Sequence, residues 1–147
     1  MSPGDGWVAR HEKLPDERDS TTYKFNVAGH EGYLTAGRYP DGRLGEIFIK
    51  MGREGSTVSG LTDSVAIAVS GGLQHGVPLA WFASKYIGSK WEPFGVTTNG
   101  DDDLSTATSI FDHVFRYLLK RFPGGLYLPL RTADAAVPSP PPADPPA

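Results

Sequence analysis

The chain has 147 residues, enough for one domain with a hydrophobic core, and its 39% hydrophobic and 21% charged residues are ordinary for a globular protein. The formal net charge of -3 argues against nonspecific binding to nucleic acid or to a membrane surface, where a basic surplus is expected. No apolar run approaches the roughly 20 residues of a membrane-spanning helix, and the N-terminus lacks the pattern of a signal peptide. We therefore expect a cytoplasmic protein without a membrane partner.

Several kinds of chemistry have no support in this sequence. It contains no cysteine, which excludes disulfides, thiolate metal sites and reactions on a thiol of this chain. No serine lies in a GxSxG setting. Asp112 and His113 are neighbours, so they should point apart on a helix. The histidines lack the spacing of metal ligands, and no metal site is predicted; they are His11, His30, His75 and His113.

The first part of the chain is predicted to form an arm and three strands. Residues 1–20 form an extended N-terminal arm that Trp7 and Val8 could pin to the body, with a mobile terminus as the alternative. Alternating polar and apolar residues predict strands at 22–27, 33–39 and 44–50. Turn-forming residues at 29–32 and 40–42 separate them. Turns this short favour an antiparallel meander.

A helix is predicted to follow the third strand. Apolar residues at helical spacing extend from Ser56 or Thr57 to His75, and a hydroxyl at the start would cap the free amides of the first turn. Gly76 suits a left-handed helix stop. Glycine costs about 1 kcal/mol against alanine inside a helix, so interior glycines indicate close packing against another element, or a kink. They are Gly60, Gly71 and Gly72.

Two more helices are predicted, one from Pro78 to Gly88 and one over residues 104–122, with Asp101, Asp102 and Asp103 before it as favourable charges at its positive end. Trp91 and Phe94, in the loop between them, are expected to plug the edge of the core, with a binding platform as the alternative. The predicted domain covers residues 21–125. Residues 126–147 are an apolar tag followed by a disordered tail rich in proline and alanine.

The glycine-rich turn between the third strand and the first helix is the candidate binding site. Backbone amides at a helix start, with basic side chains nearby, can hold a phosphate. The turn has neither the GK[ST] of a Walker loop nor a GxGxxG motif, so an ordinary turn is the alternative. If Gly55 supports a required backbone shape, Gly55→Val should cost a few kcal/mol. The candidate anion- or nucleotide-binding residues are Lys50, Arg53, Gly55, Ser56 and Thr57.

A set of short segments resembles one known family when taken together. They are residues 14–18 (LPDER), 32–37 (GYLTAG), 41–49 (DGRLGEIFI), 54–57 (EGST), 73–78 (LQHGVP), 91–95 (WEPFG) and 109–122 (SIFDHVFRYLLKRF). In their order and spacing they resemble the domain that follows the catalytic barrel in vitamin B12-dependent, or class II, ribonucleotide reductases. The resemblance covers most of the chain before the tail.

That family reduces ribonucleotides to deoxyribonucleotides with adenosylcobalamin and with a thiyl radical on a barrel cysteine. The present chain has no cysteine, and from its initial methionine and its length we expect it to lack the barrel. The resemblance therefore implies a shared fold and shared partners, and it transfers no catalytic residue. Adenosylcobalamin is implied only for the parent enzyme, and no cofactor is assigned to this chain.

The sequence thus predicts an α+β domain, a three-stranded antiparallel meander with three helices packed on one face. The function that we expect is that of a non-catalytic accessory or binding module related to the reductase. It would associate with a reductase subunit, a nucleotide or cobalamin, or be a detached piece of a split ribonucleoside-diphosphate reductase. The alternative is a structural or assembly protein that uses the domain for self-association or other protein contacts. An independent enzyme is the least favoured of these interpretations.

Overall fold

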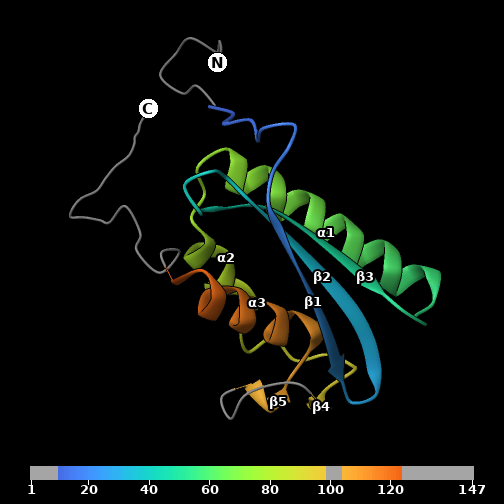
Figure 1. Ribbon diagram of the computed structural model, residues 1–147. Helices are drawn as coiled ribbons and strands as arrows, with labels where there is room; N and C mark the ends of the chain where they lie inside the picture. The colour runs from blue at the N-terminus through green and yellow to red at the C-terminus, as the bar shows by residue number, and fades with distance from the viewer. Residues whose placement is uncertain (1–9, 99–103, 124–147) are drawn as a thin grey trace, which may run out of the picture.

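The structure is a computed structural model that describes residues 10–98 and 104–123. Three antiparallel strands in the order β1-β2-β3 form the main sheet, and α1, α2 and α3 pack with it (Figure 1). This confirms the predicted α+β class. The elements are β1 (Ser20–Val27), β2 (His30–Arg38), β3 (Leu44–Met51), α1 (Ser56–Gln74), α2 (Leu79–Tyr86), β4 (Gly95–Val96), β5 (Thr106–Ala107) and α3 (Ile110–Arg121), with β4 and β5 paired in a small second sheet.

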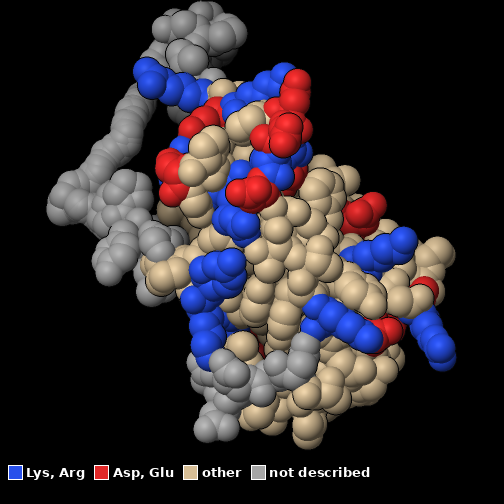
Figure 2. All heavy atoms as spheres, viewed as in Figure 1, with Lys and Arg blue, Asp and Glu red and all other residues tan. Residues whose placement is uncertain are grey.

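Buried and exposed side chains alternate along the strands, so the main sheet has one face covered by the helices and one uncovered face. Phe25, Leu34 and Ile49 are buried on the covered face, where Tyr23 is opposite Leu34 and Leu34 is opposite Ile49. The ring of Tyr117 on α3 stacks on Tyr23 at 3.7 Å between centroids. The helices therefore contribute to one core on this face. The middle of the opposite face is largely uncharged in Figure 2.

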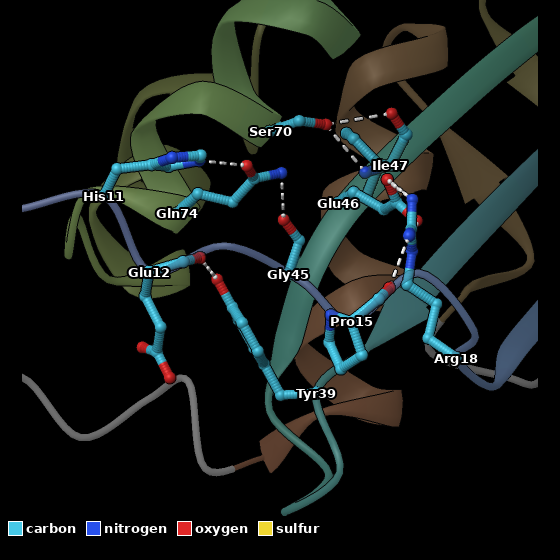
Figure 3. A network of polar contacts seen from close by, with 10 residues as sticks. All are labelled: His11, Glu12, Pro15, Arg18, Tyr39, Gly45, Glu46, Ile47, Ser70 and Gln74. Carbon is cyan, nitrogen blue, oxygen red and sulfur yellow. Dashed lines mark hydrogen bonds and ion pairs between the residues drawn. The ribbon is translucent and has the colours of Figure 1, made fainter.

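α1 runs alongside β3 and covers its backbone edge (Figures 1 and 3). Ile47 N–H donates to Ser70 Oγ at 2.8 Å, and Ser70 Oγ donates to the carbonyl of the same residue at 3.0 Å. One turn further along α1, Gln74 Nε2 donates to the Gly45 carbonyl at 3.1 Å. A strand edge normally presents unpaired backbone groups. Here two side chains of a helix satisfy them.

The described part of the N-terminal arm is fixed against the ends of α1 and β3 (Figure 3). Glu12 N–H donates to the Gln74 carbonyl at 2.8 Å, and Tyr39 Oη donates to the Glu12 carbonyl at 2.6 Å. Leu14 is buried beside Gly45, where a Cβ would lie 2.7 Å from Leu14 Cδ2. The arm therefore packs as part of the body from residue 10 onward, while Trp7 and Val8 lie outside the described residues.

An ion pair holds the second half of the arm. Arg18 donates to both carboxylate oxygens of Glu46, from Nε at 2.6 Å and from Nη2 at 2.9 Å. Arg18 Nη1 also donates to the Pro15 carbonyl at 2.7 Å. In Figure 2, acidic and basic side chains gather at the top of the molecule, over the arm. The arm is thus held to the body by the Arg18–Glu46 ion pair as well as by the apolar contact of Leu14.

The third helix begins later than predicted. Ser109 Oγ accepts from the Asp112 amide, so Ser109 caps a helix that starts at Ile110. Leu104 and Ala107 are buried ahead of that helix, and Ala107 belongs to β5. Their apolar spacing matched a helix because burial in an irregular segment can reproduce the same spacing. The predicted cap at Asp101–Asp103, like the tag at 126–130, falls outside the described residues.

The turn between β1 and β2 is shorter than predicted. Ala28 and Gly29 have φ of 52° and 89°, so the strands pair up to Val27 and His30. Asn26 Oδ1 accepts from Gly29 N–H at 2.8 Å and stabilises the turn. The sequence prediction placed the turn at 29–32 because alanine rarely adopts a positive φ. The Asn26 hydrogen bond helps to hold this unusual conformation.

Loop and glycine predictions were confirmed in part. Trp91 packs on Phe111 with ring centroids 5.0 Å apart, as expected, but Phe94 is 59% exposed and does not plug the core. Close packing is found at Gly72, where a Cβ would lie 2.5 Å from Phe82 Cζ. A Cβ at the other two interior glycines of α1, Gly60 and Gly71, would meet no atom within 4 Å, so the packing prediction was wrong there.

Candidate functional site

The glycine-rich turn places its candidate residues at the end of β3 and the start of α1. Lys50 is exposed on the uncovered face opposite Tyr33, and Arg53 is exposed in the turn. Gly55 is the N-cap of α1, and no side chain caps that helix. The predicted cap by the hydroxyl of Ser56 or Thr57 was therefore wrong. These hydroxyls follow the N-cap rather than occupying it.

The turn also contains the carboxylate of Glu54, close to the candidate residues in sequence. Glu54 Oε2 lies 2.7 Å from His30 Nδ1, and the Glu54 side chain is 13% exposed. A negative charge beside the helix start opposes the binding of another anion. Gly55 has φ -63° and ψ 166°, an extended conformation open to any residue. The anion site at this turn stays a prediction, while the reason for expecting a costly Gly55→Val substitution is removed.

A cleft of about 550 Å³ lies elsewhere, at the end of the molecule where β2, α1 and α3 terminate. This volume is within the range of small-molecule sites, about 300 to 1,000 Å³. Apolar side chains form much of its lining, among them Leu44, Leu73, Val77, Leu79 and Phe122. Arginines from three separate segments, Arg38, Arg43 and Arg121, also line it. The cleft therefore combines an apolar surface with basic groups.

The three arginines differ in how their charges are balanced. Arg43 Nη1 donates to Glu12 Oε1 at 2.9 Å, and Arg43 Nε donates to Asp41 Oδ2 at 2.7 Å. The hydrogen bonds that Arg43 donates raise its pKa, the one to Glu12 most and the one to Asp41 next. The charge of Arg43 is therefore already paired with these two carboxylates. In the part of the chain that the structure describes, neither Arg38 nor Arg121 forms an ion pair. The positive charge offered to the cleft comes from these two.

A threonine hydroxyl brings the two arginines together. Arg38 Nη1 donates to Thr21 Oγ1, and Arg121 Nη2 lies 3.5 Å from the same oxygen. One residue comes from the end of β2, one from the last position of α3, and Thr21 from β1. Each guanidinium has five N–H donors, so both keep donors beyond this contact. The described residues thus place two like charges side by side at an apolar cleft.

The chain matches the TSCPD domain over residues 9–122, which is most of its length. It belongs to the TSCPD domain family. Relatives of this TSCPD domain include proteins named vitamin B12-dependent ribonucleotide reductase in Rhodopirellula baltica, Streptantibioticus cattleyicolor and Bradyrhizobium diazoefficiens, which are 48%, 46% and 49% identical to it over 116, 124 and 111 residues. These matches confirm the resemblance found in the sequence. No solved structure matches the chain.

The TSCPD chain corresponds to a small part of each relative. The alignments cover 79%, 84% and 76% of this chain but only 11%, 20% and 9% of the respective reductase. Within residues 10–98 and 104–123, no three side chains of the types His, Cys, Asp or Glu gather as a metal site. Over the same residues, no helix has the length and apolar character needed to cross a membrane.

Two buried polar residues on α3 of the TSCPD domain, Asp112 and His113, connect α3 to other elements of the fold. Asp112 Oδ1 accepts from Gly88 N–H at 2.7 Å and from Arg116 Nε at 2.9 Å, and its Oδ2 accepts from Thr108 N–H at 3.0 Å. Burial raises the pKa of Asp112, but these hydrogen bonds outweigh it and lower the pKa overall. Asp112 thus ties the end of α2 to the start of α3.

His113 points the other way, as its place beside Asp112 on a helix predicted. Its Nε2 lies 2.9 Å from Tyr23 Oη, and its side chain is fully buried. Nδ1 has no hydrogen-bond partner among the described residues. Burial lowers the pKa of His113, and the nearby charge of Asp112 opposes this only in part. His113 thus packs inside the TSCPD domain against the rings of Tyr23 and Phe25.

The sequence around Asp112 contains a local signal for the start of a helix. Ser109 followed three residues later by Asp112 is a helix-start pattern, in which the hydroxyl caps the amide of the acidic residue. The arginine cleft had no comparable signal. Its two arginines without a carboxylate partner among the described residues lie at positions 38 and 121, and only the fold brings them together.

Proposed function

We propose that this TSCPD domain is a non-catalytic accessory module of vitamin B12-dependent ribonucleotide reduction, the step that makes DNA precursors. One observation carries the proposal: close to half of the aligned residues are identical to proteins named as such reductases, over 76% to 84% of the chain. The chain has no thiol of its own for reductase chemistry. In this proposal adenosylcobalamin and the radical chemistry belong to the partner enzyme, and the complex forms in the cytoplasm.

The outward side of α1 is the surface that we propose contacts the reductase. This α1 outer face consists of Gly60, Leu61, Ser64, Ile67 and Ala68, which follow one another at helical spacing and are all exposed. Leu61 and Ile67 are 61% and 69% exposed. Asp63, exposed beside these residues, is the one charged residue of α1, and the rest of the outward side is uncharged. An exposed helix normally carries polar or charged residues there, so a partner that covers this face accounts for its composition.

The glycines of α1 support the same assignment. Gly60, and Gly71 further along the helix, would have open space for a Cβ, so nothing within the described chain requires glycine at either position. Each glycine lowers helix stability by about 1 kcal/mol relative to alanine. Small residues on a helix let another element approach its backbone closely. The alignments cover only 11% and 9% of two of the reductases, so the relatives are far longer than this chain, which supports the choice of the reductase as the proposed partner.

The test measures binding of the full chain to the intact vitamin B12-dependent reductase from the same cells, by biolayer interferometry. We expect Leu61→Lys combined with Ile67→Lys to weaken binding at least tenfold, because it places two charges in an apolar interface. Val96→Lys is the matched control, since Val96 is 68% exposed on β4, away from α1. It should bind as the wild type does. No binding by the wild type, or equal loss in both variants, would contradict the proposal.

Self-association is the other function that the α1 outer face could serve, and the same variants separate the two. Sedimentation of the chain alone decides between them. A dimer that the Leu61→Lys and Ile67→Lys changes dissociate, together with no binding to the reductase, would favour an assembly role instead.

A further inference from the structure

The cleft between the ends of β2, α1 and α3 has features that contact with a reductase does not require. Arg38 and Arg121 line it, and neither is paired with a carboxylate in the described part of the chain. Two neighbouring like charges repel each other, and the repulsion is relieved when an anion binds between them. Their shared contact with Thr21 Oγ1 keeps them adjacent while leaving most of their donors available.

The remaining lining restricts the kind of anion. Leu73, Val77 and Pro78 supply apolar surface next to the arginines, at the turn between α1 and α2. Gly76 in this turn has φ 94°, and Val77 N–H donates to the Gly72 carbonyl at 2.9 Å, so the turn has a fixed backbone shape. An inorganic ion would leave this apolar surface exposed to water. A molecule with one charged end and one apolar end would cover both parts of the cleft.

The hydrogen-bond donors of the two arginines favour a phosphate group over a carboxylate at the charged end. A phosphate monoester carries close to two negative charges at neutral pH, about as many as the two guanidinium groups can balance, and it has three oxygens to accept hydrogen bonds. Arg43 adds no free positive charge, because it is paired with two carboxylates, Glu12 and Asp41, and these three groups together carry one negative charge. Arg38, Arg43 and Arg121 against Glu12 and Asp41 leave one net positive charge, so the preference for phosphate rests on its three acceptor oxygens, where a carboxylate has two.

We infer that this cleft is a binding site for a small organic phosphate, whose phosphate lies between Arg38 and Arg121 and whose apolar body lies against Leu73, Val77 and Pro78. Thr21 is a positioning residue, because its hydroxyl holds the two guanidinium groups in place. The inference goes beyond the accessory role proposed above and requires no protein partner. It also places the anion site at the opposite end of α1 from the glycine-rich turn.

The probe for this site is phenyl phosphate, which has one phosphate and one apolar ring. Binding to the full chain is followed by amide chemical shifts in NMR titrations. We expect shifts at the cleft residues and weaker binding of both inorganic phosphate, which lacks the ring, and benzoate, which has a single charge. Equal binding of benzoate would overturn the assignment to phosphate. Shifts that occur only around Lys50 and Arg53 would overturn the cleft in favour of the glycine-rich turn.

Three substitutions test the roles of the individual residues. Arg38→Gln and Arg121→Gln should each weaken phenyl phosphate binding about tenfold or more, because each removes a charge-assisted hydrogen bond. Arg53→Gln is the matched control, since it makes the same change in net charge outside the cleft, and it should leave binding unchanged. Thr21→Val should weaken binding less than the loss of either arginine.

Arg121 is exposed at the end of α3, so the Arg121→Gln variant keeps the test valid if Arg38→Gln proves unstable. An unchanged melting temperature with lost phosphate binding is the expected result for it. Equal binding by Arg121→Gln and Arg53→Gln would overturn the inference. None of these outcomes depends on whether the reductase binds α1.

Discussion

Helices α1 and α3 pack into the same core but present different surfaces to the outside. α3 is amphipathic, with Arg116, Lys120 and Arg121 outward and a stripe of buried apolar residues inward. α1 has Asp63 as its only charged residue, and its outer face is small or apolar. A charged outer face is well solvated by water, whereas covering an apolar outer face lowers the free energy of the system. The outward sides of α3 and α1 therefore differ in charge, and the proposed contact of α1 with the reductase would account for that difference.

The largest expected effect is at the buried carboxylate of α3. Asp112→Ala removes a buried carboxylate that accepts from Gly88, Thr108 and Arg116 in part-buried hydrogen bonds, so we expect a loss of about 3 kcal/mol in the free energy of unfolding. Asp63→Ala, an exposed aspartate on α1, is the matched control and should change stability by no more than about 0.5 kcal/mol. Urea unfolding measures both. Similar losses of unfolding free energy for Asp112→Ala and Asp63→Ala would contradict the special role of the buried carboxylate on α3.

A second pair of substitutions compares neighbouring glycines within α1. Gly72→Ala would force its Cβ to within 2.5 Å of Phe82 Cζ, and the resulting overpacking should cost about 2 kcal/mol. Gly71→Ala has open space and should stabilise the domain by about 1 kcal/mol through helix propensity. Thermal unfolding checks both signs. If Gly71→Ala also weakens reductase binding, the glycine serves the interface; a stabilised variant that binds normally would argue against close approach at Gly71.

The pH dependence of stability tests the buried histidine. Burial lowers the pKa of His113 below its usual value of 6.5, so the unfolded chain takes up a proton before the folded protein does. This contribution to stability is complete above about pH 6.5 and is lost as pH falls through the lowered pKa of the folded state. Asp112 also loses its contribution on acidification, but only near and below its usual value of 3.8. We expect a melting temperature that decreases between pH 7 and pH 5.

His113→Gln is the control for that titration, because glutamine has no charge at either pH. Its melting temperature should be lower overall but should depend less on pH over the same interval. An identical slope in wild type and variant would show that another group titrates.

The smallest expected effect is at the start of α1. Gly55 is an N-cap without a side-chain hydrogen bond, and its backbone conformation is open to other residues. Gly55→Ser should therefore raise stability by a few tenths of a kcal/mol, because serine can accept from a free amide of the first turn. Gly55→Val should cost about 1 kcal/mol or less, as a poorer cap. A loss of several kcal/mol for valine would restore the view that glycine is required there.

Much of the fold could be predicted because its signals are local. The alternation in β1, β2 and β3 and the helical spacing in α1 and α2 reflect burial on one side of each element. The start of α3 and the β1–β2 turn were missed for physical reasons. Leu104 and Ala107 are buried without being helical, and Ala28 takes a positive φ that sequence alone does not favour. In both cases contacts made elsewhere in the fold outweigh the local preference.

The binding sites were harder to predict than the fold. The glycine-rich turn has a recognisable local pattern, yet its Glu54–His30 contact comes from a residue 24 positions away. Arg38 and Arg121 come from opposite ends of the domain, and no spacing rule connects them. The α1 outer face was visible in the sequence as a helix with almost no charge. Its meaning required the structure, because only the structure shows which side of α1 the core leaves uncovered.

The contacts of Ser70 and Gln74 with β3 determine how another chain can join this sheet. Many partners bind by β-augmentation, in which an incoming strand pairs with an open edge. α1 already occupies the backbone groups of Gly45 and Ile47, so this mode is closed along that part of β3. At the far edge of the sheet, Val27 at the end of β1 is bridged to Thr97. In the contact proposed for α1, a partner would therefore bind a helix surface rather than add a strand. The same hydrogen bonds also block edge-to-edge pairing with another copy along that part of β3.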